Sequence, residues 1–118
     1  MWAKARGQGG GDTVGTISAR EAIGLVDDPD TVFVDVRERD ELPATGIIRG
    51  AAVAPLSRLA AAADLGSAEH VPALSSGKRL VLYCATGRRS ATAAHALAAR
   101  GVGNAVNLAG GPIEPAEA

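Results

Sequence analysis

The chain has little of three things that mark common classes of small protein: cysteine, aromatic side chains and long apolar runs. Its 118 residues contain one cysteine, and its aromatic residues are one Trp, one Tyr and one Phe. A single cysteine cannot form an internal disulfide, which excludes a disulfide-stapled scaffold. With aromatic residues at 3%, the core must be built from Ala, Val, Leu and Ile. At this length we expect one domain with one active site.

Strong charge of one sign is also lacking. The formal charge of −1 gives no bulk attraction to nucleic acid or to an anionic membrane, and no apolar run approaches the roughly 20 residues of a membrane span. The first 15 residues lack the apolar middle of a signal peptide, so we expect a cytoplasmic protein without nucleic-acid or membrane partners. His70 and His95 have no suitably spaced further ligands, and we expect no metal and no cofactor.

What charge there is lies unevenly along the chain. Residues 27–41 hold seven acids and two bases, whereas residues 76–113 hold five bases and no acid. The only cysteine, Cys84, lies in this second part. We therefore expect its neighbourhood to attract anions.

The alternation of apolar runs with helical segments predicts the fold. Strands are predicted at residues 16–17, 31–36, 51–54 and 77–84, a fifth strand with a turn over 104–111, and helices at 18–26, 57–66 and 88–100. Strands that alternate with helices through short connections form right-handed βαβ units. We therefore expect an α/β protein with three α/β/α layers and a central, mainly parallel five-stranded sheet. We expect a flexible tail over residues 1–15, a domain over 16–113 and a C-terminal tail over 114–118.

Local signals mark two helix ends. Ser18 and Glu21 fit a capping box that opens the first helix. The helix is expected to bury its apolar residues Ala22, Ile23, Leu25 and Val26. Gly101 is expected to cap the end of the alanine-rich helix.

The stretch YCATGRRS, residues 83–90, places Cys84 at the carboxyl end of a predicted strand, shortly before a helix. Ligands of parallel sheets bind at this end of the strands. Backbone N–H groups and the positive end of a helix can converge there on an anion, which lowers a thiol pKa from its free value of about 8.5. Gly87 suits a turn with a positive φ angle. Cys84 is therefore predicted to be a nucleophile, although a lone cysteine at a strand end is also a common core residue.

This stretch resembles the active-site loop of the single-domain rhodaneses. In that family glycine, arginine and serine follow the cysteine at the third, fifth and sixth positions, and Gly87, Arg89 and Ser90 match. The segments VFVDVRERDEL, GIIRGAAVAPLSRL and NAVNLAGG resemble, in order, the family's Asp-Val-Arg strand end, its Gly-His-Ile-Pro-Gly-Ala segment and its last strand with a glycine pair. The likeness runs from about residue 16 to residue 111.

The resemblance implies sulfur transfer by Cys84. The thiolate attacks the outer sulfur of an anionic donor, most readily thiosulfate, releases sulfite and holds the sulfur as a persulfide. The acceptor is cyanide or a thiol, including a thiol of another protein. The substrate-binding residues are then those of the loop: Ala85, Thr86, Gly87, Arg88, Arg89 and Ser90. The arginines supply positive charge, and the loop amides stabilise the persulfide and the departing oxyanion.

Other residues have supporting roles in this hypothesis. Asp35 and Arg37 stand at the carboxyl end of a predicted strand, where they can pair with each other or hold loop backbone. Pro112 stands where the family usually continues into a closing helix, so we expect thin C-terminal packing that a partner or second subunit could cover. For the chain itself we expect a monomer or a weak homodimer.

Two other functions stay open. Rhodanese-like domains also serve as non-catalytic interaction or regulatory modules, although these typically lose the cysteine. Cysteine phosphatases of related fold place their arginine six positions after the cysteine, commonly with histidine before it. Here those positions are Ser90 and Tyr83, and the arginine comes one residue earlier. Arsenate reductase chemistry usually needs a second thiol, which the chain lacks.

Overall fold

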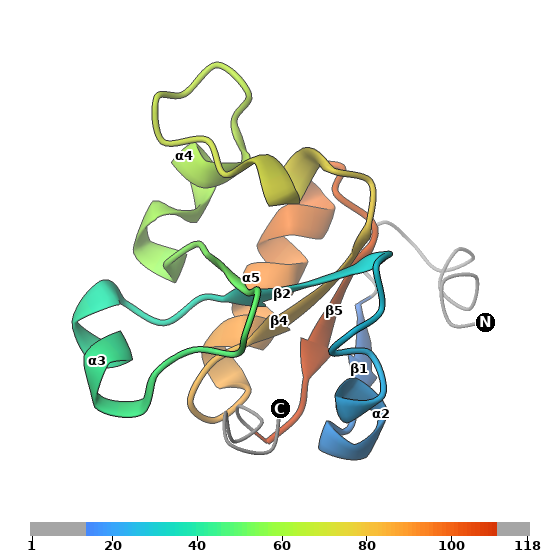
Figure 1. The fold of residues 1–118 in the computed structure, drawn as a ribbon. Helices are drawn as coiled ribbons and strands as arrows, with labels where there is room; N and C mark the ends of the chain where they lie inside the picture. The colour runs from blue at the N-terminus through green and yellow to red at the C-terminus, as the bar shows by residue number, and fades with distance from the viewer. Residues whose placement is uncertain (1–13, 111–118) are drawn as a thin grey trace.

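The computed structural model describes residues 14–110, which form a five-stranded sheet between two layers of helices (Figure 1). The strands are β1 (Gly15–Ile17), β2 (Thr31–Asp35), β3 (Ala52–Val53), β4 (Arg79–Tyr83) and β5 (Ala105–Leu108). Their order across the sheet is β1-β5-β4-β2-β3, and every neighbouring pair is parallel. The expected three-layer fold with a parallel five-stranded sheet is thus confirmed.

α-Helices and 3-10 helices connect these strands. The α-helices are α2 (Ala19–Ile23), α3 (Leu42–Thr45), α4 (Leu59–Ala63) and α5 (Arg88–Ala99). Short 3-10 helices are η2 (Arg39–Glu41), η3 (Leu56–Arg58) and η4 (Pro72–Ser75). Within residues 14–110, no helix is both long and apolar enough to cross a membrane.

The sheet carries a separate apolar core on each face, because successive side chains of a strand point to opposite faces. Leu80 and Leu82 of β4 pack in the core that includes residues of α4 and α5. Val81 and Tyr83 pack in the other core, with Ala22 of α2. Burial on both faces explains why β2 and β4 are continuous apolar runs in the sequence.

The first helix is shorter than the sequence predicted. Its capping box is confirmed, because the Ser18 side chain accepts from the Glu21 N–H and the Glu21 carboxylate accepts from the Ser18 N–H. The expected burial of Ile23 is wrong, since this side chain is 47% exposed. A helix of five residues turns only one narrow face to the sheet, and Ala22 occupies it. Leu25 and Val26 are half-buried and reach the same core from the turn that follows.

Further differences concern the bounds of elements and two short helices that the sequence did not predict. The predicted helix over 57–66 is the 3-10 helix η3 followed by the shorter α4, and the strand over 51–54 is the two-residue β3. The charged turn after β2 contains η2 and α3, which the sequence did not predict. The predicted tails lie outside the described residues, except that β1 already begins at Gly15.

Candidate active site

Cys84 directly follows β4, and α5 begins at Arg88. The neighbouring strand β2 ends beside it, because Asp35 pairs with Tyr83 in the parallel register. The turn between Cys84 and α5 therefore lies at the carboxyl edge of the sheet, beside the end of β2. This is the edge at which open α/β sheets bind their ligands.

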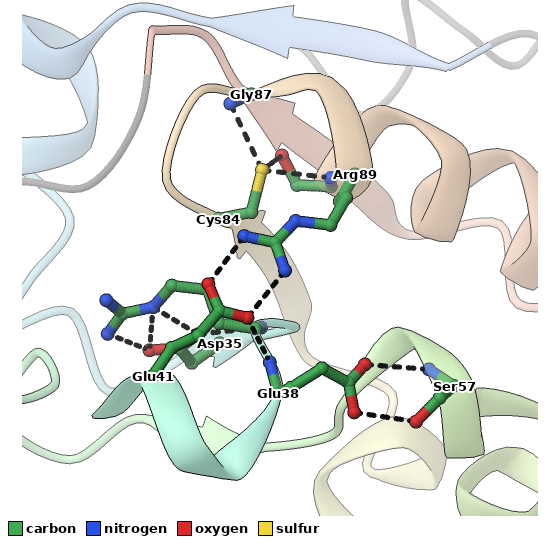
Figure 2. Close-up of polar contacts among 9 residues, drawn as sticks. Asp35, Glu38, Glu41, Ser57, Cys84, Gly87 and Arg89 are labelled. Atoms are coloured by element: carbon green, nitrogen blue, oxygen red, sulfur yellow. Dashed lines mark hydrogen bonds and ion pairs between the residues drawn. The ribbon is translucent and has the colours of Figure 1, made fainter. Parts of the chain in front are cut away.

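The sulfur of Cys84 is fully buried and surrounded by hydrogen-bond donors. The backbone N–H groups of Gly87 and Ser90 donate to Sγ at 3.1 and 3.3 Å (Figure 2). Burial by itself raises the pKa of Cys84, but hydrogen bonds from the Ser90 hydroxyl and from the N–H groups of Ser90, Thr86 and Gly87 outweigh it, and the pKa lies below the ordinary thiol value. The N-terminus of α5 adds positive potential. This arrangement favours the nucleophilic thiolate.

Gly87 is required by two features of the turn. Its φ angle is 92°, which confirms the positive φ predicted from the sequence. A Cβ atom here would lie 2.9 Å from the N atom of Gly110 and 3.3 Å from the carbonyl oxygen of Leu108. The turn thus packs closely against the end of β5, and this contact fixes the Gly87 N–H that points at the sulfur.

Asn107 of β5 belongs to the site, although it was not among the residues predicted from the sequence. The Cys84 Sγ–H donates to Ser90 Oγ at 3.5 Å, and Ser90 Oγ donates to Asn107 Oδ1 at 2.5 Å. Ser90 and Asn107 are both buried. In the sequence, Asn107 could have been recognised as the single polar residue within the otherwise apolar strand AVNL.

Arg89 is held by Glu41, a second residue that the sequence did not indicate. Its Nη1 and Nη2 atoms donate to the two carboxylate oxygens of Glu41 at 2.7 and 2.8 Å. Glu41 also accepts from the Glu38 N–H at 2.9 Å. The bonds from Arg89, and then the one from Glu38, lower the pKa of Glu41 to about 2, and Glu41 in turn raises the pKa of Arg89. Figure 2 shows the Arg89 guanidinium between Cys84 and Glu41.

Asp35 and Arg37 pair with each other, as expected from their position at one strand end. Arg37 Nε donates to both carboxylate oxygens of Asp35, and its Nη2 donates to Oδ2 at 2.8 Å. The same Nη2 donates to the carbonyl oxygen of Gly46 at 2.7 Å. Nearby, the Tyr83 hydroxyl accepts from the Ile48 N–H at 3.1 Å. Together, these contacts of Asp35, Arg37 and Tyr83 fix the chain after α3 to the ends of β2 and β4.

The remaining candidates differ in position. Ala85, Thr86 and Arg88 of the loop are exposed, and Thr86 Oγ1 accepts from the Arg88 N–H at 3.4 Å. His95 lies on an exposed part of α5, and His70 bonds a carbonyl and a serine hydroxyl in the connection before β4. Among residues 14–110, no three His, Cys, Asp or Glu side chains gather as a metal site would require.

Comparisons with known proteins identify a family and similar folds. The family model described as rhodanese-like domain matches residues 18–112. A solved protein of unknown function and possible tyrosine phosphatase from Rhodopseudomonas palustris is 31% identical, with a TM-score of 0.77 over 83% of this chain and 76% of that one. A rhodanese-related protein from Thermoplasma volcanium is 29% identical, with a TM-score of 0.65 over 82% and 85% of the two chains.

A human protein is also similar. The human single-domain sulfurtransferase TSTD1 is 27% identical, with a TM-score of 0.64 over 87% of this chain and 95% of that one. No curated protein matches the sequence significantly.

Proposed function

The chain belongs to the rhodanese-like domain family, and we propose that it is a sulfurtransferase that carries a sulfane sulfur as a persulfide of Cys84. The observation that carries the proposal is the buried Cys84 sulfur, which accepts N–H bonds from Gly87 and Ser90. These bonds stabilise negative charge on the sulfur. Such a site suits a sulfur atom that alternates between thiolate and persulfide.

The reaction consists of two displacements at sulfur. In the first, the Cys84 thiolate attacks the outer sulfur of thiosulfate, the S–S bond of the donor breaks, and sulfite leaves with the bonding electron pair. In the second, the acceptor attacks the outer sulfur of the persulfide and Cys84 leaves as thiolate. With cyanide as acceptor the product is thiocyanate, and with a thiol it is a new persulfide. Neither displacement requires an external oxidant or reductant.

The loop residues divide between these tasks. The N–H groups of Gly87 and Ser90 hold the sulfur, while the exposed Arg88 and the side chain of Arg89 attract the anionic donor. Proposed partners are thus a small anionic sulfur donor and a thiol or cyanide acceptor, with a protein thiol included. A cytoplasmic location and a monomer or weak homodimer remain proposals from the sequence.

The test is thiosulfate-to-cyanide transfer, measured as thiocyanate formation, with Cys84→Ser beside the parent protein. We expect the variant to lose at least about a hundredfold in rate, because the nucleophile carries both half-reactions. Mass spectrometry after thiosulfate treatment should show one added sulfur on Cys84. Equal rates in parent and variant would overturn the nucleophile assignment. Absence of the adduct with every donor, together with tight binding to a protein, would favour an interaction module.

Phosphatase activity is the second candidate, because a similar solved structure carries the description of possible tyrosine phosphatase. In this chain the arginine comes five positions after Cys84, at Arg89, and Ser90 occupies the sixth. This loop is shorter than the loop of the cysteine phosphatases, and its Gly87 and Ser90 N–H groups surround a single sulfur. We expect it to be too small for a tetrahedral phosphate. Release of phosphate from p-nitrophenyl phosphate that depends on Cys84 would reverse this order of preference.

A further inference from the structure

The two arginines at the site use their donors differently. Arg37 is 4% exposed and directs Nε and Nη2 into the protein, to Asp35 and to the Gly46 carbonyl. Arg89 turns its outer end, Nη1 and Nη2, to Glu41. No acceptor for its Nε–H occurs among residues 14–110. Arg37 therefore serves the fold, whereas one edge of the Arg89 guanidinium remains available to a donor anion.

Glu41 cancels the charge of this guanidinium. The two side chains are 34% and 35% exposed, so the pair faces solvent, and Figure 2 shows the Arg89 guanidinium between Glu41 and the buried sulfur. Glu41 remains ionised at every physiological pH, because Arg89 lowers its pKa to about 2. The net charge contributed by the pair is zero, whereas the uneven charge along the sequence predicted a neighbourhood that attracts anions.

Contacts from Glu38, which is itself bound by Ser57, fix the Glu41 carboxylate. The Glu38 N–H donates to Glu41, and the Glu38 carboxylate accepts from the Ser57 N–H at 3.2 Å and from the Ser57 hydroxyl at 2.7 Å (Figure 2). Glu41 is thus held from η2 and, through Glu38, from η3. A carboxylate fixed in this way repels an incoming anion in proportion to the charge of that anion.

We propose that Glu41 determines the charge selectivity of the site, so that donors with one negative charge are favoured over thiosulfate with two. The inference rests on the proposed sulfurtransferase function and names its substrate class: singly charged sulfane-sulfur donors such as thiosulfonates, R–SO₂–S⁻, and organic persulfides, R–S–S⁻. Thiosulfate remains a substrate, but Glu41 weakens its attraction to Arg89.

Methanethiosulfonate is a suitable probe because it replaces one oxyanion of thiosulfate by a methyl group. The Cys84 thiolate attacks its outer sulfur, a new S–S bond forms at Sγ, and the donor S–S bond breaks. Methanesulfinate leaves with the electron pair. The charge is −2 on each side of this step, and no other reactant is needed.

The first test compares kcat/KM for thiosulfate and for methanethiosulfonate, with cyanide as acceptor. In Glu41→Gln the thiosulfate-to-thiosulfonate ratio should rise about three- to tenfold, because the carboxylate charge is lost while the side-chain length is kept. Glu41→Asp keeps the charge and should leave the ratio within about twofold of the parent. Glu69→Gln is the matched control, since Glu69 forms a similar surface pair with Arg58. It should leave the ratio unchanged.

The second test does not depend on sulfur transfer. Cys84 is alkylated with iodoacetate, which is anionic, and with iodoacetamide, which is neutral. Both reagents react with the same thiolate, so a change in the Cys84 pKa cancels in the ratio of their rates. Glu41→Gln should raise the iodoacetate-to-iodoacetamide ratio about threefold, and Glu41→Asp should not.

These experiments test the role of Glu41 separately from the proposed sulfurtransferase function. Unchanged ratios in Glu41→Gln, or equal changes in the Gln and Asp variants, would overturn the role of Glu41 and leave the proposed function standing. Failure of the parent protein to form a persulfide with either donor would overturn the proposed function. The alkylation ratio would still decide whether Glu41 sets the charge of the site.

Discussion

At the scale of single residues, the Ser90 hydroxyl connects the charge of Cys84 to a buried amide. With Cys84 as thiol, Sγ–H donates to Ser90 and Ser90 donates to Asn107. A thiolate has no proton to donate and is stabilised when the Ser90 hydroxyl turns toward it, which leaves the buried Asn107 oxygen without that proton. Asn107 therefore competes with the thiolate for the same hydroxyl proton.

This competition predicts opposite effects on the Cys84 pKa. Ser90→Ala should raise this pKa, because the thiolate loses one hydrogen bond. Asn107→Leu should lower it, because the hydroxyl is free to serve the sulfur. The pH dependence of alkylation by iodoacetamide measures both, and its midpoint should move up in the first variant and down in the second. Shifts of the same sign in both would contradict the competition.

Gly87 gives a prediction about stability. Gly87→Ala places a Cβ atom 2.9 Å from the Gly110 N atom, and the φ angle is unfavourable for alanine. We expect a loss of about 2–4 kcal/mol in the free energy of unfolding, together with slower alkylation of Cys84. Gly77→Ala is the matched control, because Gly77 has a φ of 80° with open space around it. Urea unfolding should show a loss of only about 1 kcal/mol there, and equal losses would argue against the steric contact.

At the scale of elements, Arg37 joins the end of β2 to the chain after α3. Arg37→Leu leaves the fully buried Asp35 carboxylate without its counter-charge, and we expect it to cost about 3–5 kcal/mol. The double variant Asp35→Asn/Arg37→Leu removes both charges and should recover a large part of this loss. Urea unfolding of the three proteins provides the comparison. A double variant less stable than the single one would show that the pair acts by another route.

Elements and site residues were predictable from sequence to the extent that their signals were local. The capping box of α2, the buried runs of β2 and β4, and the positive φ of Gly87 each follow from residues close together in the chain. The pair of Asp35 and Arg37 was also anticipated, since the two residues share one strand end. Ile23 was placed wrongly because a wide buried helix face was expected, whereas the five-residue helix α2 buries only Ala22.

Contacts between distant segments left no comparable signal. Arg89 was identified as the loop arginine, but its partner Glu41 lies 48 residues earlier. Asn107 reaches Ser90 from a different strand, 17 residues later. The Arg89–Glu41 and Ser90–Asn107 contacts depend on how β5, η2 and α5 are arranged at one edge of the sheet. This arrangement exists only in the folded chain. The sequence therefore predicted the turn between Cys84 and α5, but not the charge balance around it.

At the scale of the whole molecule, the pair of Glu41 and Arg89 connects stability to pH. The pKa of Glu41 falls to about 2 in the folded chain, chiefly through its bonds from Arg89, and lies near 4.5 without them. A carboxyl group with a lowered pKa in the folded state contributes its full stabilisation above the unfolded value and loses it as pH falls toward the folded value. The contribution of this pair should therefore disappear between about pH 4.5 and about pH 2.

Glu41→Gln tests this window, because glutamine does not titrate. The difference in the free energy of unfolding between parent and variant should be largest near pH 5 and should shrink steadily as pH falls to about 2.5, as urea unfolding at each pH can measure. In an Arg89→Gln background the same substitution should show little of this pH dependence, because the main cause of the low Glu41 pKa is gone. A difference that is constant with pH, or one that grows on acidification, would mean that Glu41 is not held ionised by Arg89. The charge selectivity inferred for the site would then lose its structural basis. The pH dependence of stability and the charge selectivity both require that Glu41 and Arg89 form an ion pair in the resting protein.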